Sequence, residues 1–344
     1  MHCVNVDQLE PGAVVAKTFF GENGRLMIRQ GTKITDDLIN RMKSHNITMI
    51  FIEDNLNTVG CNDIIKPELR AEAIQSLEQI YLSAKDHIQS KDKFGVVLDN
   101  IVKAIIDDLA SNNKNFISIL DLKSHDNYTY AHSVNVAILS IVTGMAIGCD
   151  YSKLKNIGIG AMLHDIGKAS IPLNILNKAG KLTPLEFALI QKHPEIGFRK
   201  SKLNLDIEPT ARSIILQHHE KLDGTGYPGG RTSDTIHQFA KIVAIADIYD
   251  ALTSERPYRK RWPIKESLDF LQQIAGNYID PEILKAFANR IAPYPVGSKV
   301  MVSDSRIGYV INNRNLTRPI IGFSNGDTFD MSKETYLYIR EIVD

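Results

Sequence analysis

Seven candidate metal-binding residues, five histidines and two aspartates, are spread over positions 132 to 247 of this 344-residue chain. They are His132, His164, Asp165, His193, His218, His219 and Asp247. Imidazole and carboxylate ligands together suit iron, manganese, zinc or nickel rather than a metal that prefers thiolates. Seven ligand groups are too many for one tetrahedral ion, so the set predicts two divalent metals.

Taken singly, these residues have ordinary structural explanations, and the hypothesis depends on the set. A lone histidine such as His132 is more often a satisfied core or surface residue than a ligand. His164 and Asp165 are stronger candidates because they end an apolar run. Burying an imidazole beside a carboxylate is costly unless the two groups pair or bind a cation.

His218 and His219 constrain the local structure that a shared site would need. Adjacent helical residues point about 100° apart, so the two can reach one ion only near a helix end. Asp223-Gly224 predicts such an end just downstream; the alternative is that the two rings face different partners. Asp247 lies in an apolar stretch predicted to be helical, and a charge on that face calls for a cation.

Three further signals flank the set: Lys168, the glycine-rich loop Asp223–Pro228 and the basic run Arg256–Arg261. The basic run could be a solvated surface patch. Because it starts nine residues after Asp247, we favour a role in binding phosphate, whose oxygens match the planar fork of arginine.

Composition limits the function classes. Lys plus Arg and Asp plus Glu both number 40, which argues against a long nucleic acid as the main partner but allows a small anionic ligand. Cys3, Cys61 and Cys149 show no paired spacing and look like reduced thiols. The first residues lack a signal-peptide pattern, and the apolar stretch 134–148 is too short to span a bilayer. We expect a cytoplasmic protein without a membrane partner.

The pattern along the chain predicts a mainly α fold with small strand-containing units at both ends. Residues 113–293 read as almost wholly helical, with a capping box at Thr183–Glu186. Short strands near residues 12–16, 25–28 and 47–52, with a helix after Thr35, predict an α+β unit. The last residues predict a small β-barrel or meander, with Asn325-Gly326 as a hairpin turn.

We therefore expect four parts: an α+β domain, a pair of linker helices, the main helical domain and a β domain, over residues 1–58, 63–112, 113–293 and 294–344. The apolar stripe of the linker helices could pack on the next domain or form a homodimer. Packing is favoured, because the repeat is too short for a confident coiled coil.

Several of these stretches carry a family resemblance: Tyr128–Val136, Leu163–Lys168, His193-Pro194, His218–Pro228 and Ile245–Arg259. Together they resemble the HD-GYP family, a branch of the HD phosphohydrolases. An His-Asp pair alone is weak evidence, whereas the His-His-Glu to Gly-Tyr-Pro stretch with the downstream Asp and Arg-Pro-Tyr is highly specific. The flanking units are also similar to segments that often accompany this domain in bacterial proteins.

The resemblance implies an all-helical domain that binds two, sometimes three, metals and hydrolyses cyclic dinucleotides, chiefly cyclic di-GMP, to pGpG and/or GMP. It assigns one metal to His132, His164, Asp165 and Asp247, and the other to Asp165, His193, His218 and His219. Lys168, Arg256 and Arg259 match positions that contact substrate phosphates, and Asp223, Gly224 and Tyr227 belong to the loop that shapes the pocket. Tyr128 stands where some relatives have a glutamate for a third metal, which favours two.

A physical mechanism accompanies this resemblance. Two cations, most simply iron or manganese, can trap a bridging water and lower its pKa, so that hydroxide attacks phosphorus in line with the leaving oxygen. Asp165, which the resemblance places in both metal sets, and Lys168, whose positive charge would offset that of the phosphate oxygens, are the expected catalytic residues. Two alternatives stay open: a non-catalytic receptor that binds the dinucleotide, and a hydrolase of another cyclic dinucleotide.

Overall fold

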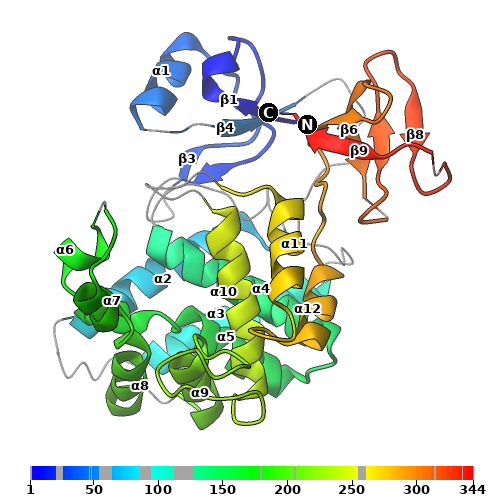
Figure 1. The fold of residues 1–344 in the computed structure, drawn as a ribbon. Helices are drawn as coiled ribbons and strands as arrows, with labels where there is room; N and C mark the ends of the chain where they lie inside the picture. The colour runs from blue at the N-terminus through cyan, green and yellow to red at the C-terminus, as the bar shows by residue number, and fades with distance from the viewer. Residues whose placement is uncertain are drawn as a thin grey trace. The chain divides into compact units, whose positions relative to one another are not determined.

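The computed structural model describes residues 2–20, 26–45, 47, 49–53, 64–85, 94–111, 128–178, 180–204, 207–254, 261–313, 315–334 and 336–343. Figure 1 shows their secondary structure, which is mainly helical with strands near both ends of the chain. The mainly α fold predicted from the sequence is confirmed. The described residues from 68 to 290 form one compact unit, called here the helical unit.

The helical unit contains eleven α-helices and one short 3-10 helix among its described residues. In chain order they are α2 (Pro67–Lys85), α3 (Phe94–Ser111), α4 (Tyr128–Ala146), α5 (Tyr151–Met162), η4 (Ile166–Ser170), α6 (Leu173–Leu176), α7 (Pro184–Ile190), α8 (His193–Asn204), α9 (Pro209–Gln217), α10 (Gln238–Thr253), α11 (Ile264–Ile274) and α12 (Pro281–Ala288).

The core of this unit lies among α4, α5 and α10. Helix α4 packs against both others, α5 also packs against α9, and α8 packs against α9 and η4. Helix α10 buries residues on all of its sides, as a helix without a polar face must. Figure 1 shows α4 and α10 side by side in the middle of the unit. Polar side chains on their buried faces therefore meet other protein groups rather than water.

Local sequence signals determine where these helices begin. Asp150 caps α5 by accepting a hydrogen bond from the Lys153 amide. The predicted capping box at α7 is confirmed: Thr183 Oγ1 accepts from the Glu186 amide and the Glu186 carboxylate accepts from the Thr183 amide. Both caps satisfy amides that the first helical turn leaves without partners. Helix α9 ends at Gln217, with His218 as its C-cap, so His218 and His219 stand at a helix end.

The N-terminal residues form short strands and one helix around their own core. β1 (His2–Asn5) pairs antiparallel with β4 (Met49–Ile52), and β2 (Phe19–Phe20) pairs with β3 (Leu26–Ile28). Between them lie η1 (Val6–Gln8) and α1 (Asp36–Ser44), which Thr35 caps as predicted. The strand expected near residues 12–16 is wrong: Val14 and Val15 make only isolated bridges, to Lys33 and Ile52.

The C-terminal residues form a five-stranded antiparallel sheet in the order β8-β7-β6-β5-β9. The strands are β5 (Lys299–Val302), β6 (Ile307–Asn312), β7 (Ile320–Gly322), β8 (Thr328–Asp330) and β9 (Ile339–Ile342). Gly326 joins β7 to β8 with φ of 89°, which glycine adopts without strain. Alternating residues of β5 are buried and make a core with residues such as Val310 and Ile321.

The helices α2 and α3 belong to the same compact unit as α4 to α12. The division of the chain at residues 58, 112 and 293 stays a prediction. None of the helices in the described parts of the chain combines the length and apolar character that crossing a bilayer requires.

Candidate metal centre

The helical unit gathers the seven predicted metal-binding side chains into one cluster, although they come from five different segments. His132 lies in α4, and His164 and Asp165 lie in the turn between α5 and η4. His193 begins α8, His218 and His219 follow α9, and Asp247 lies in α10. His193 is fully buried and Asp165 is 2 % exposed, so the cluster is largely shielded from water.

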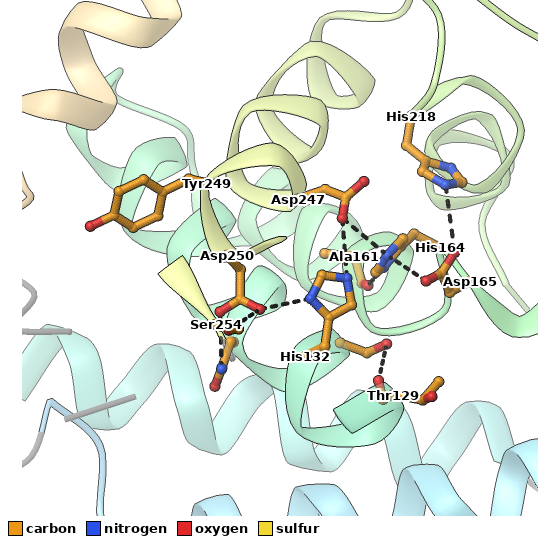
Figure 2. Close-up of polar contacts among 12 residues, drawn as sticks. Thr129, His132, Ala161, His164, Asp165, His218, Asp247, Tyr249, Asp250 and Ser254 are labelled. Atoms are coloured by element: carbon orange, nitrogen blue, oxygen red, sulfur yellow. Dashed lines mark hydrogen bonds and ion pairs between the residues drawn. The ribbon is translucent and has the colours of Figure 1, made fainter. Parts of the chain in front are cut away.

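The ligand atoms form two overlapping sets. Those of the first set lie within 4.8 Å of one another, as do those of the second; the sets are Asp165, His193, His218 and His219, and His132, His164 and Asp165. Asp247 adjoins the second set, because its Oδ1 lies 3.1 Å from His132 Nε2 and 3.9 Å from His164 Nε2. Figure 2 shows Asp247, His164 and Asp165 turned toward one another. Asp165 is the residue that both sets share.

Three of the histidines are oriented by a carbonyl near the end of the helix that precedes each of them. The Nδ1 atoms of His164, His193 and His218 lie 2.7, 2.7 and 3.0 Å from the carbonyl oxygens of Ala161, Ile190 and Ile215, in each case three residues earlier. Carbonyls at helix ends lack helical partners and accept such a bond. An Nδ1–H that donates to a carbonyl leaves Nε2 as the lone-pair atom, which is the tautomer that binds metal through Nε2.

This tautomer leaves lone pairs facing one another inside the protein. His193 Nε2 and His218 Nε2 are 3.2 Å apart, and neither carries a proton when both Nδ1 atoms donate. Among the described residues, His164 Nε2 and Asp165 Oδ1 are buried without a hydrogen-bond partner. Orphaned buried acceptors are costly, and a cation among them removes that cost. The donor set therefore fits divalent metal, as does its mixture of imidazole and carboxylate.

The electrostatics of the first set favour the protonation states that cations need. Burial lowers the pKa of His218 well below its usual value, and the neighbouring His219 lowers it further. Burial also lowers the pKa of His219 to about 3. For Asp165, burial raises the pKa, but Lys168 and His164 outweigh burial and hold it well below the usual range. Neutral imidazoles beside an ionised carboxylate are the forms that bind metal near neutral pH.

His132 differs from the other histidines because carboxylates flank both of its ring nitrogens. Asp247 Oδ1 lies 3.1 Å from Nε2, and Asp250 Oδ2 lies 2.7 Å from Nδ1. Burial lowers the pKa of His132, but the hydrogen bonds to Asp247 and Asp250 outweigh it and raise the pKa to about 10. Figure 2 shows Asp250 on the side of the ring away from the cluster. Asp250 was not predicted from the sequence, where its only signal is its place three residues after Asp247 on the same helical face.

Lys168 lies beside the shared carboxylate. Its Nζ is 2.6 Å from Asp165 Oδ2, and its side chain keeps 27 % of its surface exposed. The 3-10 helix η4 places the two residues on one side, three positions apart. An ion pair alone would explain this contact. A partly exposed lysine at the edge of the cluster can also bind an anionic ligand.

The glycine-rich loop reaches the cluster through Tyr227. Its amide donates to the His219 carbonyl at 3.2 Å, and its ring centroid is 4.7 Å from that of His219. The peptide between Tyr227 and Pro228 is cis. Gly226 must be glycine, because a Cβ there would lie 2.4 Å from the Lys221 nitrogen. Tyr227 thus covers one side of the first ligand set.

Buried Glu220 holds this loop in place, a role that sequence reasoning missed. Its Oε1 accepts from the Gly229 amide at 2.7 Å and its Oε2 accepts from the Arg231 amide at 2.8 Å. A carboxylate that accepts two backbone amides fixes the loop at both points. The available signal was its position directly after the histidine pair, inside the motif itself.

The remaining residues predicted to bind the ligand are Asp223, Gly224, Arg256 and Arg259. Asp223 is exposed, and its Oδ1 accepts from both the amide and the hydroxyl of Thr225. Gly224 has φ of 80° and supports the turn. Both have local structural roles, and their contact with a ligand stays a prediction. Arg256 and Arg259 lie outside the described residues, so their predicted role also stays a prediction.

Replacing Glu220 by glutamine is expected to loosen the loop. The amide oxygen can accept only one of the two backbone bonds, and the new NH2 group would face a backbone donor. Leaving a buried donor unmatched costs about 1–3 kcal/mol of unfolding free energy. Amide hydrogen exchange at Gly229 and Arg231 should accelerate, while exchange in α4 stays unchanged. The exposed Glu282 supplies a matched Glu→Gln control; equal exchange in wild type and Glu220→Gln would contradict the role of Glu220.

Comparisons with known proteins point in one direction. The HD domain family matches residues 114–283. A cyclic di-GMP phosphodiesterase of Pseudomonas aeruginosa is 38% identical over 205 residues, which cover 59% of this chain and 49% of that protein. A cyclic di-GMP phosphodiesterase of Thermotoga maritima is 30% identical over 271 residues, which cover 73% of this chain and 74% of that protein. The chain thus spans about half of the first relative and three quarters of the second.

A solved structure agrees with the fold. The HDG"Y"P protein Bd1817 from Bdellovibrio bacteriovorus matches with a TM-score of 0.56 over 83% of this chain and 97% of that one. The sequence identity is 20%, so the likeness concerns the fold alone. The fold of the chain is therefore shared with that protein.

Proposed function

The chain belongs to the HD-GYP branch of the HD domain family, and from this premise we propose that it is a metal-dependent phosphodiesterase of cyclic dinucleotides. Cyclic di-GMP is the proposed substrate, with pGpG and/or GMP as product. The two relatives compared above carry this activity in their names. The observation that carries the proposal is the pair of ligand sets that share Asp165.

We propose two metal ions, iron or manganese, one held by each ligand set. Asp247 completes the set of His132 and His164 as a fourth ligand. Divalent cations in these sets would supply an acidified water as nucleophile and would neutralise charge on the phosphate. Asp165, as the shared ligand, holds the two cation positions next to each other. The mixture of three imidazoles and one carboxylate in one set, and of two imidazoles and two carboxylates in the other, suits first-row ions.

The surrounding residues take roles that follow from their places. Lys168 would donate to a phosphate oxygen, because its side chain is partly exposed and its Nζ lies beside Asp165. Tyr227 presents an aromatic ring beside His219, where a nucleobase can stack. For Arg256 and Arg259 the proposal rests on the motif, and they would bind the second phosphate through paired hydrogen bonds.

Metal analysis combined with a turnover assay tests the proposal. The chain is purified anaerobically, its metal content is counted, and cyclic di-GMP is followed by chromatography with added Mn²⁺ or Fe²⁺. We expect about two metals per chain and a linear or mononucleotide product. Metal-loaded protein that binds cyclic di-GMP without converting it would establish the receptor alternative instead. Conversion of cyclic GMP-AMP or cyclic di-AMP alone would establish the hydrolase of another cyclic dinucleotide.

Replacing Lys168 by methionine is expected to lower kcat about 100-fold while the metal content stays the same. Removal of one preorganised donor from a phosphate transition state has an effect of this size, and methionine keeps the length of the side chain. The exposed Lys153, which forms an ion pair with Asp150 at the surface, supplies a matched Lys→Met control. A Lys168→Met variant with unchanged kcat would show that this residue only pairs with Asp165.

A further inference from the structure

The His132 ligand is held in a way that differs from the other oriented histidines. His164, His193 and His218 each direct Nδ1 to a neutral carbonyl of their own chain segment. His132 instead directs Nδ1 to a buried carboxylate, Asp250 Oδ2, 118 residues away in sequence. The carbonyl that lies three residues before His132 belongs to Thr129 and accepts from Ser133 Oγ at 3.1 Å.

A carboxylate partner affects both the orientation and the basicity of a ligating imidazole. An imidazole that binds a cation through Nε2 keeps its proton on Nδ1 and donates it to the partner group. A carboxylate accepts this proton more strongly than a carbonyl, which makes the imidazole a better ligand. The properties of His132 therefore depend on what fixes Asp250.

Two groups fix the Asp250 carboxylate, which is 3 % exposed. Asn135 Nδ2 donates to its Oδ1 at 3.0 Å, and Ser254 Oγ donates to its Oδ2 at 3.2 Å. Asn135 lies three residues after His132, so the two side chains share one face of α4. Asp250 has the same relation to Asp247 on α10. One face of α4 thus carries the ligand His132 and the supporting Asn135. One face of α10 carries the ligand Asp247 and the supporting Asp250.

The orientation of Asn135 is in turn determined by Arg70. Arg70 Nη2 donates to Asn135 Oδ1 at 2.5 Å, and both residues are 7 % exposed. Because the amide oxygen accepts from arginine, the amide nitrogen must face Asp250, which settles the choice between the two amide orientations. The guanidinium also brings a positive charge to the far end of a chain of hydrogen bonds that contains the buried Asp250 carboxylate.

Arg70 comes from α2, outside the segment that matches the HD domain family, residues 114–283. A second contact holds α2 near α4: Tyr81 Oη lies 3.4 Å from Ser133 Oγ. The hydrogen-bond chain Arg70–Asn135–Asp250–His132, called here the relay, therefore joins α2, α4 and α10 behind one metal ligand.

We propose that Arg70, Asn135 and Asp250 are positioning residues that orient His132 and thereby set the metal affinity of the ligand set of His132, His164, Asp165 and Asp247. In the other set, His193 and His218 have carbonyl partners of their own, so this set does not depend on the relay. One helix outside the matched domain thus controls the occupancy of one of the two cation sites. The inference rests on the proposed metal-binding function, but not on which substrate the chain hydrolyses.

The test measures Mn²⁺ binding to the full chain, without substrate, by competition with a graded chelator. Asp250→Asn should weaken one of two Mn²⁺ ions about 10–100-fold and leave the other unchanged, the usual effect of removing a partner behind a metal ligand. Arg70→Met should weaken the same ion by a smaller factor. Arg70→Lys should restore part of the affinity, because lysine still offers a donor to Asn135 Oδ1.

The double variant Arg70→Met/Asp250→Asn distinguishes the relay from a general loss of packing. If the relay acts as one chain, Arg70→Met has no further effect on Mn²⁺ affinity once Asp250 is asparagine. Asn135→Leu provides a further variant should Asp250→Asn fail to fold.

Unchanged Mn²⁺ affinity in foldable Arg70→Met and Asn135→Leu, or equal weakening of both ions, would overturn the proposal. So would a wild-type chain that binds no Mn²⁺. Turnover of cyclic di-GMP is recorded separately: two bound Mn²⁺ ions, of which the variants weaken only one, in a chain without turnover would refute only the proposed function.

Discussion

Replacing Asp165 by asparagine is expected to abolish hydrolysis of cyclic di-GMP, with a fall in turnover of at least about 1,000-fold, or about 4 kcal/mol of activation free energy. The metal content should fall below that of the wild type at the same time. Circular dichroism should show an unchanged helical content, because the core among α4, α5 and α10 is apolar and independent of this side chain.

The size of this effect follows from the contacts of Asp165. Its Oδ1 lies 3.2 Å from His193 Nε2, and its Oδ2 lies 3.3 Å from His164 Nε2. Each carboxylate oxygen thus serves one ligand set. Asparagine has only one acceptor oxygen, so its NH2 group would face a cation or an imidazole lone pair in one set. The charge that offsets both cations is lost as well.

A matched control separates this loss from a general effect of removing a carboxylate. Asp234 is exposed in the segment between the glycine-rich loop and α10, and Asp234→Asn should leave turnover and metal content unchanged. Full activity of Asp165→Asn would refute the two-set assignment. Loss of activity together with loss of helical content would attribute the effect to folding, and Asp165→Glu would then test the charge.

Replacing Gly167 by alanine is expected to separate His193 from Asp165. A Cβ at residue 167 would lie 1.9 Å from the His193 carbonyl oxygen and 2.8 Å from the Gly197 nitrogen. Both neighbours are backbone atoms of α8, so no side-chain rotation can relieve the clash. The segment η4 must therefore move away from α8. Overpacking of this kind costs about 1–3 kcal/mol or more. We expect at least about 3 kcal/mol, since the backbone itself must move.

Denaturant unfolding and metal analysis measure the two consequences of Gly167→Ala. The midpoint should fall, and the chain should lose the metal held by His193, His218 and His219 before the other one. Gly180 is the control, because an added Cβ would meet nothing within 4 Å and its backbone is not left-handed. A Gly167→Ala protein with wild-type stability and metal content would mean that η4 and α8 do not pack as described.

The sequence predicted local features of this protein well where short-range chemistry decides them. The capping box of α7, the Thr35 cap and the strand Lys299–Val302 are confirmed because each depends on a few neighbouring residues. The strand expected at residues 12–16 failed for the opposite reason. Its apolar residues need a partner strand along their length, and the chain provides only isolated bridges at Val14 and Val15.

The metal-binding residues could be predicted from the sequence because histidine and aspartate are residue types that commonly bind metal ions. Buried histidines and aspartates are costly, and a set of seven has few explanations other than metal. The resemblance to a known motif then assigned them to two sets, with Asp165 in both. The roles of Asp250 and Glu220 were not predicted, because an acidic residue that bonds to a histidine or to a loop has no sequence signature of its own.

The sequence by itself therefore determined the mainly α fold, the helix starts and the kinds of side chain available to cations. Only the tertiary structure decided which buried polar groups contact and orient those side chains. The contact of His132 with Asp250 joins residues 118 positions apart, and that of Arg70 with Asn135 joins residues 65 apart. Helical periodicity places a residue on a face, but the packing of α2, α4 and α10 determines which faces meet.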